Sequence, residues 1–255
     1  MYVHCFWHGA PLSLLERLTL KSFARNGFKV KLWLYDTNCI EVDSYIEGAE
    51  VCDANEIIPF ERIFSYNGKG DCRKGSLGGF SDLFRYYLIY KQGGMYVDMD
   101  STCLSNFDTS AEYIIKPHNS CKTVANLLKA PAGCQFLKKC IELTEQNVTA
   151  DNTSWILPVK IFNDTVEEFN LQNYIAPINY FGNDDPGILT KIKTGNYIED
   201  KNILPKYVLH WCREASFGVW NYKELFDWYN PKPLSIYYNL LTKNDLIRSR
   251  LRHYF

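Results

Sequence analysis

The chain has 255 residues, of which 46% are hydrophobic and 22% are charged, and its formal net charge is −1. This composition excludes a disordered chain, and the near-neutral charge excludes a general attraction to nucleic acid or to an anionic membrane. The nine cysteines include no C-x-x-C pair, and their odd number excludes a complete disulfide framework, so we expect reduced thiols. The chain enters strand-like sequence without a signal peptide or a transmembrane segment, which predicts a cytoplasmic location.

The first 36 residues predict a strand–helix–strand unit. Residues 2–9 are strand-like, residues 14–23 place apolar side chains at helical spacing before Asn26-Gly27, and residues 29–36 alternate between polar and apolar. Two parallel strands joined by a helix bind ligands at their carboxyl ends. We therefore expect a pocket mouth lined by Phe6, Trp7, His8 and Tyr35.

Residues 81–100 predict a helix that turns directly into a strand. Ser81 is a suitable N-cap with Asp82 in the first turn, and Gly93-Gly94 provides the stop. Residues 95–100 then alternate, which places Tyr96, Asp98 and Asp100 on one side of the strand.

Two carboxylates on one face of a strand, about 6–7 Å apart, repel each other unless a positive charge lies nearby. Magnesium or manganese would supply that charge, and such an ion keeps open positions for phosphate oxygens. The alternative for the acids is a solvated turn. Asp82 and Arg85, three residues apart on a helix, have a similar alternative as an ordinary surface ion pair.

The combined pattern Ser-Asp-x-x-Arg followed by Gly-Gly-x-Tyr-x-Asp-x-Asp resembles the Asp-x-Asp glycosyltransferases of the GT-A type. The resemblance is strongest to capsular polysaccharide transferases, α-1,6-mannosyltransferases and α-1,4-galactosyltransferases, which are related to the glucosylating toxins. It implies an α/β fold with a Rossmann-like mixed central sheet flanked by helices, in a single domain over residues 1–255. Residues 1–105 would form the donor half and residues 106–230 the acceptor half, followed by a helical segment over residues 231–255.

The resemblance also implies roles for individual residues. Asp100 would bind the metal, with Asp98 and the late-strand histidine His210 assisting, and Asp98 would also contact sugar and ribose. Donor-binding residues would further include Asp82 and Arg85 from the helix, Trp7 against the base, and Tyr96 and Met99 beside the donor. An asparagine that precedes a helix in the family would correspond to Asn126.

The remaining segments carry weaker patterns. The glycine-rich residues 65–80 indicate either a lid over the donor or a plain surface loop. Helices are expected over residues 134–143 and 165–171, and strands over residues 175–181 and 207–213. Trp211 and Trp220 could wall the site or pack in the core, and the basic C-terminal end could touch a lipid-linked acceptor or be a solvated helix end.

The resemblance thus implies a metal-dependent retaining glycosyltransferase. It would use Mn²⁺ or Mg²⁺ to move a sugar from a nucleoside diphosphate sugar to a hydroxyl of a glycan or glycoconjugate, without nucleic acid, and with membrane contact only through the acceptor. Trp7 favours a UDP-sugar in polysaccharide or other glycan biosynthesis. The alternatives are a GDP-mannose-dependent mannosyltransferase, a metal-dependent nucleotidyltransferase and a non-catalytic carbohydrate-binding module.

Overall fold

The computed structural model describes residues 1–9, 11–36, 45–182, 203–212, 231, 233 and 235–247. The strands are β1 (Tyr2–Trp7), β2 (Lys29–Leu34), β3 (Tyr45–Ile46), β4 (Ala49–Asp53), β5 (Gly94–Val97), β6 (Ser101–Cys103), β7 (Ile114–His118), β8 (Lys122–Ala130) and β9 (Val208–His210). The α-helices are α1 (Leu14–Arg25), α2 (Gly78–Gln92), α3 (Gln135–Asn147), α4 (Ile156–Glu168) and α8 (Ile236–Lys243). Short 3₁₀ turns cover Ala54–Glu56, Phe60–Arg62 and Gln172–Tyr174.

A seven-stranded sheet with the order β3-β4-β2-β1-β5-β8-β7 forms the centre of the molecule. Strands β4, β2, β1 and β5 run parallel, whereas β3, at one edge, and β8 are antiparallel to their neighbours. The predicted strand–helix–strand unit is confirmed, because β1 pairs in parallel with β2 and α1 connects them. A capping box between Ser13 and Glu16 fixes the start of α1.

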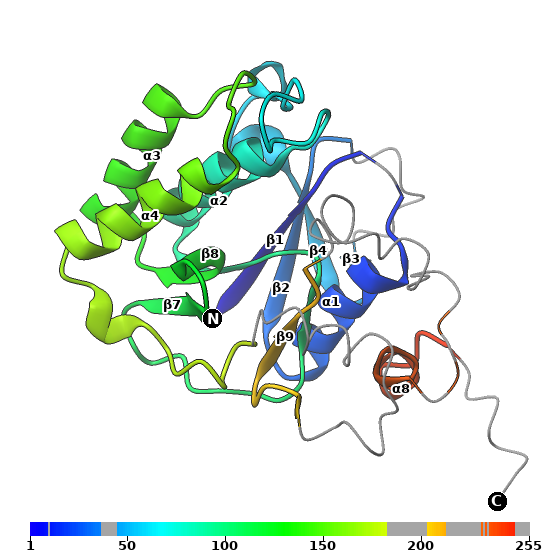
Figure 1. Ribbon diagram of the computed structural model, residues 1–255. Coiled ribbons are helices and arrows are strands. Elements are labelled where there is room, and N and C mark those ends of the chain that lie inside the picture. The colour runs from blue at the N-terminus through cyan, green and yellow to red at the C-terminus, as the bar shows by residue number, and fades with distance from the viewer. Residues whose placement is uncertain are drawn as a thin grey trace, which may run out of the picture.

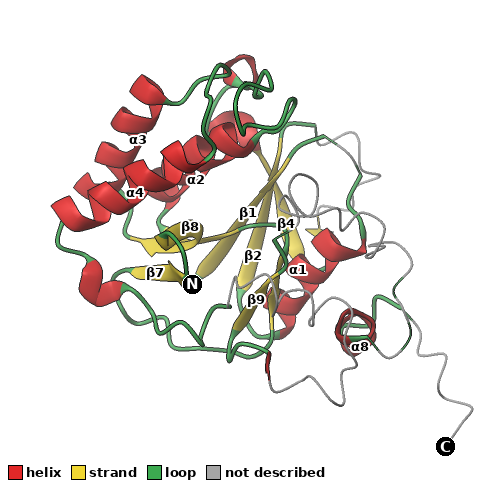
Figure 2. Ribbon diagram, in the orientation of Figure 1, coloured by secondary structure: helices red, strands yellow, loops and turns green. Residues whose placement is uncertain are grey.

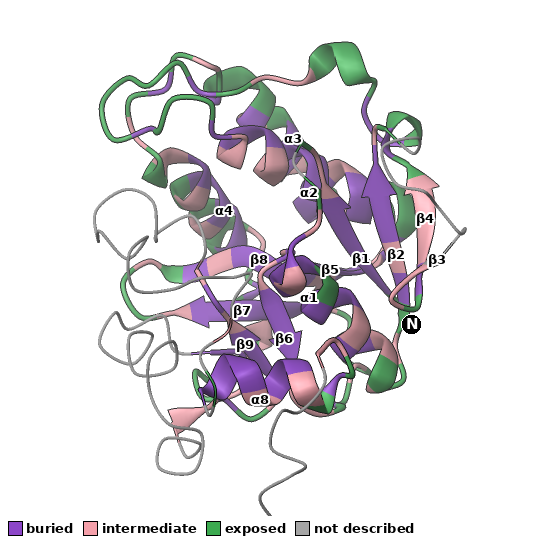
Figure 3. Ribbon diagram, turned by 90° about the vertical axis from the view of Figure 1, so that its right-hand side faces the viewer, coloured by how far each residue is buried: buried purple, intermediate pink, exposed green. Residues whose placement is uncertain are grey.

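Helices cover both faces of this sheet, as the ribbon views show (Figures 1 and 2). Helices α2, α3 and α4 lie on one face, and α1 lies on the other together with the two-stranded sheet β6-β9. Each face has its own hydrophobic cluster, one containing Phe84 and Phe162 and the other Val3 and Met95. The central strands are accordingly buried (Figure 3). The expected α/β architecture, a mixed central sheet flanked by helices in a single domain, is confirmed.

Helix α2 begins earlier than the sequence predicted. It starts at Gly78, and Ser81 is not its N-cap but a residue inside the helix whose N–H donates to Leu77 O at 2.7 Å. Asp82 therefore lies beyond the first turn. Gly78 and Gly79 were expected in the glycine-rich loop, but they form the first turn of α2. Gly79 allows close packing of the helix, since a Cβ there would lie 2.4 Å from Tyr66 Oη.

Two later expectations were also wrong in extent. Helix α4 starts at Ile156 and not at residue 165. Pro158 is compatible with this start because it falls in the first turn, where the backbone N–H groups have no partner within the helix. Residues 175–181 do not form a strand and contribute only an isolated bridge between Ile175 and Ile115.

The remaining predictions have mixed outcomes. Trp211 is fully buried in a core cluster, and its indole N–H donates to Thr102 Oγ1 at 2.9 Å. The helix expected near the C-terminus is α8, while Trp220 and residues 248–255 lie outside the described residues. Within the described parts of the chain, no helix combines the length and the apolar character needed to cross a bilayer.

Candidate active site

Three potential metal ligands meet where the central sheet joins the small sheet. Asp98 and Asp100 lie between β5 and β6, and β6 pairs antiparallel with β9 so that Ser101 is opposite His210. This pairing places His210 Nε2 3.3 Å from Asp100 Oδ1. One ligand atom from each of the three residues lies within 4.8 Å of the others. We call Asp98, Asp100 and His210 the acid–imidazole cluster.

The turn from α2 into β5 positions the two acids. Gly93 and Gly94 both have positive φ values, of 64° and 85°, a conformation that L side chains rarely adopt. A Cβ on Gly94 would lie 2.8 Å from Tyr2 O. The glycine pair therefore allows β5 to approach β1 closely, and the acids that follow emerge at the carboxyl end of the parallel strands, where ligands bind in such sheets.

Arg85 connects the helix to the first acid of the cluster. One of its guanidinium nitrogens lies 3.1 Å from Asp98 Oδ1 and the other 3.3 Å from Asp82 Oδ1. The guanidinium also lies 4.9 Å from the ring centroid of Tyr96, and its Nε donates to Ser81 O. The Arg85 side chain is only 7% exposed, so this is not the solvated surface pair that helical spacing alone would suggest.

Burial and charge together set the ionisation of these groups. Burial raises the pKa of Asp82 to about 6, although the neighbouring Arg85 lowers it. Burial likewise raises the pKa of Asp98, with Asp100 adding to the rise and with Arg85 and His210 opposing it. Three carboxylates thus share one guanidinium and one imidazole, which leaves the cluster rich in negative charge and suited to a cation.

The donor set fits magnesium or manganese. Two carboxylates supply hard oxygen ligands and His210 supplies an imidazole nitrogen. Beside them, Asn126 is buried and its Oδ1 has no hydrogen-bond partner among the described residues. An orphaned carbonyl oxygen at the edge of an acidic cluster costs free energy unless a donor or a cation satisfies it. The residues present therefore fit the metal that the sequence predicted.

Asn126 lies inside β8 and not ahead of a helix, as had been expected. Its backbone carbonyl accepts the N–H of Asp98 at 2.9 Å, and its Nδ2 lies 3.0 Å from both ring nitrogens of His210. The side chain thus reaches the cluster across the antiparallel β5-β8 pairing. The signal that could have found it is the single amide within the apolar run from Val124 to Leu128.

The aromatic residues expected at the pocket mouth are partly drawn into the core. Phe6 is buried and stacks on Phe84 at 4.0 Å between ring centroids. Tyr35 donates its hydroxyl proton to Ile58 O at 2.9 Å and meets the ring of His8 edge-on. Trp7 is partly buried on the opposite face of the sheet, against the cluster that contains Val3.

Tyr96 and Met99, predicted beside the donor, are both buried. Tyr96 lies under the Arg85 guanidinium, as described above. Met99 packs into the core on the α1 side, and its carbonyl oxygen accepts the hydroxyl proton of Thr19 at 2.7 Å. The structure therefore brings together Asp82, Arg85, Tyr96, Asp98, Asp100 and His210, whereas Phe6, His8 and Tyr35 form a separate aromatic group.

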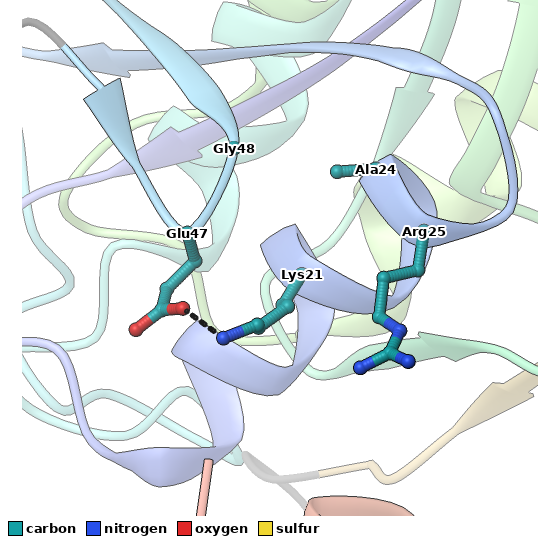
Figure 4. Close-up of a pocket in the computed structure, with 5 residues that line it drawn as sticks. All are labelled: Lys21, Ala24, Arg25, Glu47 and Gly48. Atoms are coloured by element: carbon teal, nitrogen blue, oxygen red, sulfur yellow. Dashed lines mark ion pairs between the residues drawn. The ribbon is translucent and has the colours of Figure 1, made fainter. Parts of the chain in front are cut away.

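A surface hollow of about 480 Å³ lies between α1 and the β3–β4 turn and contains none of the candidate residues. Figure 4 shows its lining, where Lys21 forms an ion pair with Glu47. Arg17 on the same helix also pairs with Glu47. Arg25, which also lines the hollow, pairs with Asp245. Each charged residue of the lining is thus engaged in an ion pair, and the acid–imidazole cluster remains the candidate site.

Comparison with known families agrees with this choice. Residues 60–120 match the family described as "Glycosyltransferase sugar-binding region containing DXD motif". This segment of the chain is therefore similar to the sugar-binding region of DXD glycosyltransferases. The matched region includes Asp82, Arg85, Asp98 and Asp100, but it ends before Asn126 and His210.

Comparisons over longer stretches are weaker. A search of curated proteins found no match. Among 55 matching chains of solved structures is the PaToxG glycosyltransferase. It is 13% identical to this chain, with a TM-score of 0.46, and the alignment covers 68% of this chain and 73% of the other.

Proposed function

We propose that the protein is a glycosyltransferase that moves a sugar, with retention at the anomeric carbon, from a nucleoside diphosphate sugar to a hydroxyl of a glycan or glycoconjugate. The observation that carries the proposal is the convergence of Asp98, Asp100 and His210 from two separate sheets beside a buried arginine. This combination provides a cation site next to a positive side chain, which is what a leaving diphosphate requires.

The acid–imidazole cluster would hold Mn²⁺ or Mg²⁺. When bound, the ion supplies positive charge that neutralises the charge developing on the leaving diphosphate. The cluster can bind the ion without a further carboxylate, because nucleotide phosphates normally complete the coordination of such metals.

Arg85 has two roles in this proposal. It holds Asp82 and Asp98 in place, since its guanidinium bonds to both. Its charge also favours a phosphate or a sugar hydroxyl at the same edge of the site, because charge-assisted hydrogen bonds are stronger than neutral ones. Asp82 and Asp98 would accept hydrogen bonds from the hydroxyls of the donor sugar and so orient it.

Retention requires either a carboxylate nucleophile or attack on the same face that the phosphate leaves. The carboxylates of the described site are already engaged, with Asp82 and Asp98 paired to Arg85 and Asp100 beside His210. We therefore favour front-face attack, in which the leaving phosphate accepts the proton of the acceptor hydroxyl.

A UDP-sugar is the proposed donor. Trp7 at the carboxyl end of β1 supports this choice, since it is only partly buried and its indole would stack on a pyrimidine with the part that the Val3 cluster leaves uncovered. Any contact of the protein with a membrane would be made through a lipid that is attached to the acceptor.

Thermal-shift screening of UDP- and GDP-sugars with and without Mn²⁺ tests this proposal. We expect a UDP-sugar to raise the melting temperature only when Mn²⁺ is present, and we expect turnover to release a free nucleoside diphosphate. Asp164→Asn removes an exposed carboxylate on α4. It serves as a control for the loss of an acid outside the cluster and should give the same thermal shifts as the wild type. Release of pyrophosphate would instead indicate nucleotidyl transfer and overturn the proposal.

A further inference from the structure

The amide of Asn126 faces His210 in a way that bears on metal binding, and the inference drawn from it rests on the proposed function. Its Nδ2 lies 3.0 Å from both Nδ1 and Nε2 of the ring. The amide therefore faces the ring edge between the two nitrogens. Asn126 is 7% exposed, and its Oδ1 is buried without a hydrogen-bond partner among the described residues.

The contacts of the ring favour one position for its proton in this arrangement. An amide N–H donates, so the ring nitrogen that it meets must accept. Nε2 faces Asp100 Oδ1 at 3.3 Å and can donate to that carboxylate. Nδ1 is then the acceptor for the amide, and the Cys212 thiol also lies 3.2 Å from it.

A metal ion at the cluster reverses this arrangement. The nitrogen beside Asp100 is Nε2, so Nε2 would bind the ion and lose its proton. Nδ1 must then carry the proton and needs an acceptor, which metal-bound histidines normally find in a carboxylate or a carbonyl oxygen. The amide N–H of Asn126 cannot accept it, and it would also point positive hydrogens toward the edge where the cation sits.

A half-turn of the Asn126 amide resolves both conflicts. Oδ1 and Nδ2 exchange places when the amide rotates by 180°, so Oδ1 would then lie about where Nδ2 now lies, within hydrogen-bond distance of Nδ1. The oxygen that lacks a partner would gain one, and the N–H groups would leave the cation edge.

We propose that Asn126 is the positioning residue that selects the metal-binding tautomer of His210, through an amide that donates to the ring before the metal binds and accepts from it afterwards. Cys212 is the competing acceptor for the Nδ1 proton. A thiol sulfur accepts hydrogen bonds weakly, so its contribution is the smaller one.

Mn²⁺ binding to the whole chain, measured by electron paramagnetic resonance without any nucleotide, is the first test. Asn126→Leu keeps the volume of the side chain but removes its acceptor, and we expect it to lower Mn²⁺ affinity by about 10- to 100-fold. Asn126→Asp keeps an acceptor and should bind Mn²⁺ at least as tightly as the wild type. Cys212→Ala should change the affinity by less than about threefold.

The ¹⁵N chemical shifts of His210, recorded at pH 8 with and without Mg²⁺, form the second test. In the wild type the proton should move from Nε2 to Nδ1 when Mg²⁺ is added. In Asn126→Leu the ¹⁵N shifts should not show this complete transfer. Asn163→Ala is the control, because this asparagine also contacts β8, through Thr123, but lies away from the cluster. It should change neither the affinity nor the tautomer.

The outcomes separate the inference from the proposed function. If wild-type protein binds no Mn²⁺ either alone or with UDP present, the proposed metal-dependent function fails. If the wild type binds Mn²⁺ and Asn126→Leu binds it equally well with the same tautomer, only the role of Asn126 is overturned. A large loss in Cys212→Ala without one in Asn126→Leu would assign the acceptor to the thiol and would also overturn it.

Discussion

The histidines of β1 and β9 show how one residue type serves two purposes. His4 is 2% exposed, its Nδ1 accepts the indole N–H of Trp33 at 3.1 Å, and it packs near Gly94. His210 lies at the end of β9, and its ring faces Asp100 and Asn126. Both residues lie on strands of the same domain, but only His210 is surrounded by groups that can share a cation.

The difference lies in which side chains each ring meets. No carboxylate of the described residues contacts His4, and burial together with the charge of Lys31 lowers its pKa to about 4. The ring is therefore fixed in its neutral form as part of the core. Around His210 the partners are an acid, an amide and a thiol, so proton and metal can exchange there. A strand histidine thus gains function from its neighbours and not from its position in the strand.

The largest expected effect concerns the acid beside His210. Asp100→Ala should lower kcat/KM by about 1,000-fold, because loss of the ligand removes charge stabilisation of the leaving group. The fold should persist, since removing Asp100 also removes its repulsion of Asp98. Steady-state kinetics at saturating Mn²⁺, with circular dichroism as the control for folding, checks this. A kcat/KM within about tenfold of the wild-type value would contradict the assignment of Asp100 as a metal ligand.

The buried histidine should control the acid limit of stability. The folded-state pKa of His4 is about 4, while an unfolded histidine titrates near about 6.5. The unfolded state therefore binds more protons between these values, and the free energy of unfolding should fall by about 3 kcal/mol as the pH decreases from 6.5 to 4. Urea unfolding at several pH values measures this fall. His4→Gln should flatten the curve in that window relative to the wild type, and an unchanged slope would contradict the prediction.

Substituting each histidine in turn tests the difference between His4 and His210. His210→Ala should lower kcat/KM by about 100-fold, because a metal ligand is lost. Its free energy of unfolding should change less than that of His4→Gln, since the His210 side chain is 14% exposed whereas His4 is 2% exposed. His4→Gln should show the reverse, with reduced stability but normal kcat/KM per folded molecule. Equal behaviour of the two variants in both assays would remove the distinction.

The smallest effect is expected for an ion pair far from both histidines. Lys160 and Asp164 form an exposed pair on α4, and such pairs contribute about 0.3–0.5 kcal/mol. Lys160→Ala should therefore shift the free energy of unfolding by no more than this amount and leave activity unchanged. Denaturant titration in parallel with the histidine variants sets the baseline for them.

The parallel half of the sheet could be predicted from the sequence because its signals are local. Alternation in residues 29–34 and the helical spacing in residues 14–25 each need only one segment to be recognised. The two acids after β5 were found in the same way. Even there, the start of α2 was missed, since the packing of Gly79 against Tyr66 is a tertiary contact.

The antiparallel part could not be predicted in the same way because it depends on distant pairing. A strand was predicted over residues 207–213, and β9 covers Val208–His210. Strands β6 and β9 have only three residues each, however, and neither carries a local signal that identifies its partner. The position of Asn126 follows from the register in which Val97 opposes Leu127, and no local pattern encodes that register. His210 was placed near the metal only through family resemblance, and the structure supplies the β6-β9 pairing that brings it there.

The pairing of β6 with β9 has a consequence for when the candidate site is completed during synthesis. Asp98 and Asp100 emerge from the ribosome well before residues 208–210, so a nascent chain that has completed β5 already carries the acids without their histidine. If the proposed function holds, binding of a nucleotide sugar would require β9 to be synthesised first, and a truncated product that ends before Tyr207 would carry the two acids without the histidine and would be inactive.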